Sequence, residues 1–131
     1  MALGQQVARI AGGALGGCVA WAVAATLLNL ALRHSWPDYA AVEKQMDFTL
    51  LMMIARLIIG ALASVAAGLA AAWISRRNAI ATWVVIATML AIFIPVHVGL
   101  WARFPTWYHL FFFTSLALFP LVGLHGMRFR R

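Results

Sequence analysis

The sequence predicts an all-α integral membrane protein in which four transmembrane helices form an antiparallel bundle. Of its 131 residues, 65% are hydrophobic and 10% are charged, whereas soluble domains are near 45–50% apolar and about 25% charged. The apolar residues gather in four runs, each long enough to cross a ~30 Å hydrocarbon core as a helix. Arginines stand in the gaps between the runs. We therefore expect a single four-span membrane domain, 1–131, with spans at about 7–32, 48–74, 79–101 and 106–126.

The first run, 7–32, has Arg9 near its start, before an apolar stretch that contains the small-residue sequence Ala22-Val23-Ala24. A cleavable signal peptide shares both features, and cleavage after this sequence is the alternative to a retained span. The run is much longer than the 7–15 apolar residues typical of a signal peptide. We therefore expect it to remain as the first transmembrane helix.

The second run, 48–74, contains Arg56, and the last two runs contain Pro95 and Pro120. Proline inside a helix removes one backbone hydrogen bond and tends to kink the helix. A static kink is the expected consequence, and a gating hinge is the alternative. The short connection around Arg103 makes the last two spans neighbours.

Small residues recur on the first two spans. Close approach of helices in lipid depends on such residues, because lipid gives helices no hydrophobic reason to associate. The two small-residue faces are at matching depth in an antiparallel hairpin, so we expect them to pack against each other; dimerisation through the first span is the alternative. The expected packing residues are Gly12, Gly13, Gly16 and Gly17 in the first span and Gly60, Ser64 and Gly68 in the second.

Basic residues are divided unevenly between the two sides of the membrane. The N-terminus, the second connection and the C-terminus carry six of them, and the other two connections carry three, together with all three acidic residues. The positive-inside rule places the six-residue side in the cytoplasm. We expect a multi-pass protein of the cell membrane with both termini cytoplasmic, and the high alanine content and short connections suggest a bacterial inner membrane. The six residues are Arg9, Arg76, Arg77, Arg128, Arg130 and Arg131.

Each span carries a polar residue at one common depth. Twenty helical residues, roughly one membrane thickness, separate Arg76 from Arg56, and similar spacings from other basic residues reach the remaining members of this layer. Arg56 is therefore expected near the outer interface rather than at the bilayer centre. The layer forms a candidate outer polar site of Asn29, Arg56, His97, His109 and Tyr108, with Thr114 and acidic residues of the first connection nearby.

This layer has three interpretations. Arginine can hold an anionic group through two parallel hydrogen bonds, and histidine can exchange protons near neutral pH, so the layer is a candidate anion or lipid site. The plainer interpretation is that polar residues are tolerated where spans end. A haem held by His97 and His109 is a third possibility. No set of cysteines or carboxylates has the spacing of a metal site, and no catalytic motif is present, so we expect no metal, no cofactor and no enzyme activity.

These observations predict a small, non-enzymatic membrane protein that serves as an accessory or assembly subunit of a membrane complex. A small transporter, or a lipid- or anion-handling protein with an outward-facing arginine and histidine site, is the first alternative, and a haem-binding redox subunit is the second. Expected partners are the lipid bilayer and other membrane subunits or a second copy of the chain. Nucleic acid is not expected, because the basic residues cluster at span ends.

Overall fold

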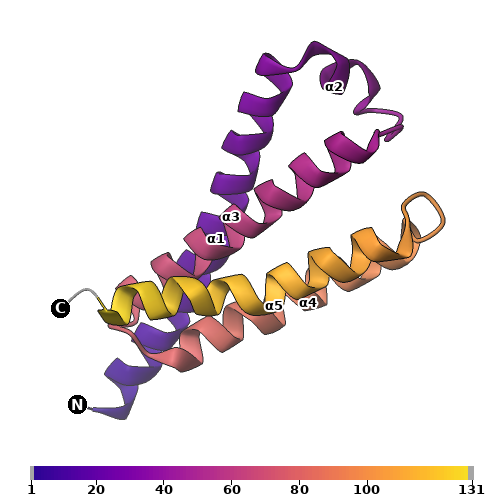
Figure 1. Ribbon diagram of the computed structural model, residues 1–131. Helices are drawn as coiled ribbons and strands as arrows, with labels where there is room; N and C mark the ends of the chain where they lie inside the picture. Colours follow the sequence, from indigo (N-terminus) through magenta and orange to yellow (C-terminus); the bar gives the residue numbers. More distant parts are fainter. Residues whose placement is uncertain (1, 130–131) are drawn as a thin grey trace.

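The computed structural model describes residues 2–129, and within them the chain is all-α (Figure 1). Four of the helices are long and apolar enough to cross a membrane, and α2 is a short helix between the first two. The predicted fold class is confirmed, and the chain is a small multi-pass integral membrane protein. The helices are α1 (Leu3–Ser35), α2 (Pro37–Val42), α3 (Leu50–Ile74), α4 (Ala79–Gly99) and α5 (Thr106–Phe129).

The helix ends lie within a few residues of the predicted span ends, and local sequence explains where they fall. The side-chain oxygens of Thr49 and Asn78 accept hydrogen bonds from backbone N–H groups in the first turns of α3 and α4. Such N-caps stabilise a helix start. After α3 the chain reverses through Arg76 and Arg77, whose φ angles of 55° and 67° end the helix.

The connection between the first two long helices is more ordered than its sequence suggested. It contains α2, which begins at Pro37, a residue favoured in the first turn of a helix. The side chain of Tyr39 in α2 is fully buried, and its ring stacks on Phe48 at 5.4 Å between centroids. This connection therefore packs onto the bundle and can contribute side chains to a site.

Both chain ends lie at the same end of the bundle in Figure 1. We call this end, with the turn at 75–78, the terminal end, and the opposite end, with α2 and the turn at 100–105, the loop end. At the terminal end α1 packs closely on α3. A Cβ atom added to Gly13 would lie 2.8 Å from the carbonyl oxygen of Ala71, and one added to Gly17 would lie 3.0 Å from that of Ala67. These two glycines therefore bring α1 into backbone contact with α3.

The small-residue face of α3 does not pack on α1 as expected. A Cβ atom added to Gly68 would collide with the backbone carbonyl of Pro120 in α5, and one added to Gly60 would meet the ring of Phe112. Gly123 of α5 approaches α3 equally closely, because an added Cβ would lie 2.5 Å from the carbonyl oxygen of Val65. Only Ser64 of the predicted face reaches α1. The expected close contact between the first two spans forms through Gly13 and Gly17 of α1, but the expected glycine pairing is corrected, because Gly60 and Gly68 of α3 face α5.

The four long helices are close together at the terminal end and diverge toward the loop end, where α1 departs from α4 and α5 (Figure 1). Near the middle of the bundle α1 still contacts α4, since the rings of Trp21 and Phe93 are 4.9 Å apart. Helices α4 and α5 continue through their prolines; Pro95 is exposed, and Pro120 is buried against Gly68. The divergence creates a space at the loop end that side chains only partly fill.

Candidate functional site

A cavity of about 450 Å³ occupies the loop end of the bundle, between α1, α3, α4 and α5. The contact of Trp21 with Phe93 forms its floor, and the Trp21 indole donates a hydrogen bond of 3.1 Å to the Ser64 hydroxyl of α3. The wall toward the loops includes Arg33, Glu43 and Met46. The remaining lining is largely apolar and aromatic, the composition usual for ligand pockets.

Arg56 of α3 is the central charge of this cavity. Its Nε donates to the Tyr108 hydroxyl at 3.3 Å, and one terminal nitrogen, Nη1, donates to the Tyr39 hydroxyl at 2.7 Å. The guanidinium also lies 4.7 Å from the centre of the Phe48 ring, close enough for a cation–π interaction. All three contacts are with neutral groups. The guanidinium is thus held in place without being neutralised.

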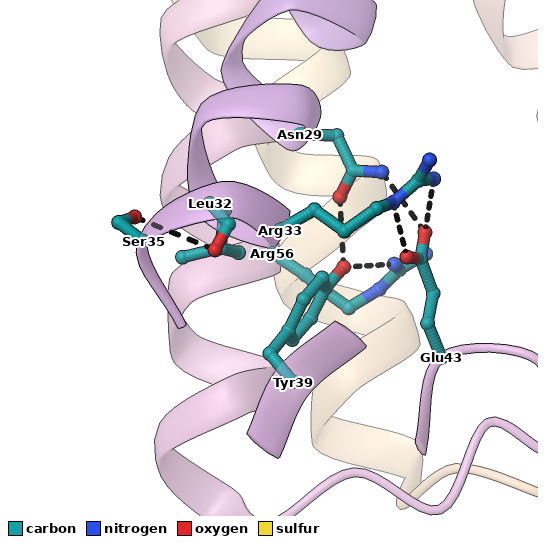
Figure 2. Close-up of polar contacts among 7 residues, drawn as sticks. All are labelled: Asn29, Leu32, Arg33, Ser35, Tyr39, Glu43 and Arg56. Atoms are coloured by element: carbon teal, nitrogen blue, oxygen red, sulfur yellow. Dashed lines mark hydrogen bonds and ion pairs between the residues drawn. The ribbon is translucent and has the colours of Figure 1, made fainter. Parts of the chain in front are cut away.

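A chain of hydrogen bonds connects Arg56 to the end of α1 through Tyr39, Asn29 and Glu43 (Figure 2). The Tyr39 hydroxyl, which accepts from Arg56, donates to the Asn29 side-chain oxygen at 2.8 Å, and the Asn29 amide donates to Glu43 at 2.9 Å. Burial raises the pKa of Tyr39, and the neighbouring Arg56 partly offsets this rise. The tyrosine therefore stays a neutral hydroxyl that accepts from Arg56 and donates to Asn29.

Glu43 is the acidic residue of the cavity wall, and Arg33 engages it. Arg33 donates two hydrogen bonds to the carboxylate, of 2.6 and 2.8 Å, in a bidentate ion pair. This interaction is the main reason that the pKa of Glu43 lies below its ordinary value. Within residues 2–129, no carboxylate lies within ion-pair distance of Arg56. The wall thus holds two guanidinium groups and one carboxylate, and the unmatched positive charge is that of Arg56.

His97 of α4 and His109 of α5 form a direct pair beside Arg56 and Tyr108. Their Nδ1 atoms are 2.6 Å apart, and His109 Nε2 lies 3.4 Å from the carbonyl oxygen of Trp101. A carbonyl can only accept, so Nε2 of a neutral His109 carries its proton and Nδ1 accepts from His97. This tautomer, assigned from the hydrogen-bond network, leaves His97 Nε2 as an acceptor. The two histidines share one proton across their contact.

The histidine pair does not fit the haem alternative. Two axial imidazoles place their nitrogens on opposite faces of the iron, whereas here the two Nδ1 atoms meet each other and Nε2 of His109 is directed at a backbone carbonyl. Among the described residues, no group of three or more histidine, cysteine or acidic side chains could hold a metal ion. We therefore derive no function through haem or metal at this position.

The structure brings together the residues of the predicted polar layer. Asn29 and Arg56 are joined through Tyr39, Tyr108 is bonded to Arg56, and the ring of His97 stacks on Tyr108 at 6.2 Å. His109 completes the set through His97. Thr114 does not take part: its hydroxyl is exposed and bonds the carbonyl of Leu110 within its own helix.

The sequence pattern did not indicate the contributions of Tyr39 and Phe48, and it did not distinguish Glu43 from the other acids of the first connection. The one available signal was the Trp36-Pro37 pair, a plausible start for a short helix that would direct Tyr39 inward. Nothing in the spacing of Glu43 indicated Arg33 as its partner. No protein family matches the chain, and neither curated proteins nor solved structures show a significant similarity to it.

Proposed function

We propose that this membrane protein binds an oxyanion, such as a phosphate or carboxylate group, in the loop-end cavity, with Arg56 as the charged anchor. The observation that carries the proposal is the pairing of Arg56 with two tyrosine hydroxyls instead of a carboxylate. A guanidinium has five N–H donors, and the two tyrosine bonds use two of them. The others remain to receive an anion bidentately, an arrangement that guanidinium geometry favours.

The surroundings support an anion site rather than a structural arginine at a span end. Taking a charge out of water is costly unless a partner compensates it. The groups that bond Arg56 directly are neutral, and the Glu43 carboxylate, which Arg33 engages, acts on Arg56 only at longer range. The Arg33–Glu43 pair satisfies the other charges of the wall. An incoming anion would therefore compensate the charge of Arg56 without displacing an internal salt bridge.

Binding is tested by thermal unfolding of the purified protein in a neutral detergent, with inorganic phosphate added at constant ionic strength. We expect phosphate to raise the unfolding temperature of the wild type, since a ligand at 100 times its Kd stabilises by about 2.7 kcal/mol. Arg56→Gln should abolish this response. Lys44→Gln, which removes a loop-end cation outside the cavity lining, should retain it. An equal response in the wild type and Arg56→Gln would contradict the proposal.

An accessory or assembly role remains a second candidate, and the exposure of α1 favours it. Only Gly13, Ala14 and Gly17 of this 33-residue helix are buried, so most of its apolar surface is available to lipid or to another subunit. Recovery of a stoichiometric protein partner after mild solubilisation, lost when Leu15 and Val19 are replaced by alanine, would favour this role. Recovery of the chain alone would count against it.

We also propose that the loop end faces outward and both termini face the cytoplasm of a bacterial cell. The support is the charge distribution together with the position of both termini at one end of the bundle (Figure 1). A reporter that is active only outside the cytoplasm should be inactive when fused after the last residue and active when inserted at 102–103. The opposite pattern would reverse the orientation and place the cavity on the cytoplasmic side.

A further inference from the structure

We propose, building on the anion site above, that the bound anion is the head group of a lipid that enters the cavity sideways from the bilayer between α1 and α4. Helices α1 and α4 separate toward the loop end (Figure 1). Their contact through Trp21 and Phe93 closes the floor of the cavity. Beyond that contact, the loop-end portions of α1 and α4 line the cavity as two facing walls.

The rim between these walls is apolar and accessible from the membrane side. Leu30 of α1 is 39% exposed and Val96 of α4 is 46% exposed, and both also line the cavity. Both are apolar side chains next to Asn29 and His97 on helices long enough to cross a membrane, so the surface they expose faces the lipid near the depth of Arg56. The cavity therefore continues into the lipid-facing surface through an opening between α1 and α4.

Polar and apolar groups are segregated across this cavity. Most of the polar members lie in the layer near the loops, and only Thr26 lies deeper, about one turn below Asn29 on α1; the layer holds Asn29, Arg33, Glu43, Arg56, His97 and Tyr108. The wall below and beside them is apolar, and a free anion gains nothing from it. A hydrocarbon chain attached to the anion would cover that wall, which is formed by Ala25, Leu30, Ile59, Phe93, Val96 and Leu100.

The depth of Arg56 matches that of a lipid head group. Helix α3 continues without interruption from Arg56 to Ile74, and this stretch is roughly 27 Å long at 1.5 Å per residue. That length is close to the hydrocarbon thickness of a bilayer. With Ile74 at one interface, Arg56 lies near the other, where the phosphates of membrane lipids are found. A lipid could place its head group at Arg56 while its chains stay in the hydrocarbon.

The loops limit access from water at the same level. Arg33 and Glu43 are held together by two hydrogen bonds and form part of the loop-end wall with Met46. Arg103 ties the 100–105 turn to the first connection by donating to the backbone carbonyl of Gln45 at 2.7 Å. The Arg103 contact bridges the two loops above the cavity, whereas Leu30 and Val96 are apolar side chains that can form no such hydrogen bond. We therefore infer that a lipid enters at the side rather than through the loops.

The test compares a lipid with its soluble head group. The protein in neutral detergent micelles is titrated with phosphatidylglycerol, with phosphatidylcholine, and with glycerol 3-phosphate, and unfolding temperature and bound lipid by native mass spectrometry are measured. We expect phosphatidylglycerol to bind at least about tenfold more tightly than glycerol 3-phosphate, a difference of about 1.4 kcal/mol. Arg56→Gln should lose that preference, and phosphatidylcholine should bind weakly.

The entrance itself is tested with one pair of variants. Val96→Trp puts a large ring at the rim and should weaken phosphatidylglycerol binding about tenfold or more, while glycerol 3-phosphate binding is unchanged. Ile92→Trp is the matched control, since Ile92 is one turn away on α4, 50% exposed, and outside the cavity lining. It should leave both titrations as in the wild type.

The outcomes separate this inference from the proposed anion site. If phosphate and glycerol 3-phosphate bind in an Arg56-dependent way but phosphatidylglycerol binds no better, the anion site stands and the lipid inference is overturned. Equal binding of phosphatidylcholine would also overturn it, because the net negative charge that distinguishes phosphatidylglycerol would then play no part. If no anion of any kind depends on Arg56, both proposals are wrong.

Discussion

The two halves of this bundle, which we call the terminal half and the loop half after the ends they include, are built from different residues. They are also stabilised by different contacts. In the terminal half, glycines and alanines allow backbone contacts, as where Gly68 meets the carbonyl of Pro120 and Gly13 meets that of Ala71. In the loop half, the helices are farther apart and are linked by long side chains such as Arg56 and Tyr39. One half is close-packed, and the other encloses a cavity.

This difference shows how a small membrane protein can keep a cavity open. Helix association in lipid relies on van der Waals packing between small residues and on interhelical hydrogen bonds. Close packing at one end fixes the directions of the four helices, and the bulky rings of Trp21, Phe93 and Phe112 then keep the loop halves apart. The polar network fills the resulting space only in part.

The largest loss of stability is expected from Gly68→Ala, in the terminal half. The added methyl group would collide with the Pro120 backbone, which cannot move away as a flexible side chain could. Overpacking of this kind typically costs about 1–3 kcal/mol, so we expect a clear fall in unfolding temperature in detergent. Gly99→Ala is the control, since an added Cβ there meets nothing within 4 Å, and it should be neutral. Equal stability of both variants would contradict the close α3–α5 contact.

The boundary between the two halves is tested by Trp21→Phe. This change keeps an aromatic ring against Phe93 but removes the hydrogen bond to Ser64. We expect a loss of about 1 kcal/mol, the usual contribution of one such bond. Trp83→Phe, on the exposed face of α4, should have no effect on stability. A Trp21→Phe protein as stable as the wild type would show that the bond does not join α1 to α3.

The smallest effect on stability is expected from Glu43→Gln, in the cavity wall toward the loops. The ion pair with Arg33 is partly exposed, since the Arg33 side chain is 45% accessible, and such pairs contribute roughly 0.2–1 kcal/mol. Because the pKa of Glu43 is lowered in the folded protein, its contribution is complete above the ordinary value of 4.5 and is lost as the pH falls through the lowered pKa. Glu43→Gln should therefore be less stable than the wild type at pH 7, and this difference should vanish in acid. A difference that persists in acid would point to a cause other than the ion pair.

Some features of the site could be predicted from the sequence and others could not. That Arg56 and His97 lie at one level of the bundle followed from counting residues along straight helices, and in the structure both contact Tyr108. The rotation of each helix about its axis did not follow from such counting. For this reason the expected pairing of α3 glycines with α1 was wrong, and the α3–α5 contact through Gly123 was not foreseen.

The amino-acid sequence by itself determined the all-α class, the four apolar helices and the position of each polar residue along its helix. The reason is that a helix rises by a fixed amount per residue, so residue number gives position along its axis. Tertiary structure alone decided which helix faces which, that Tyr39 of the short helix α2 reaches Arg56, and that His97 and His109 bond each other. These contacts depend on side-chain packing across helices far apart in the chain, and hydropathy does not encode the angle at which two apolar surfaces meet.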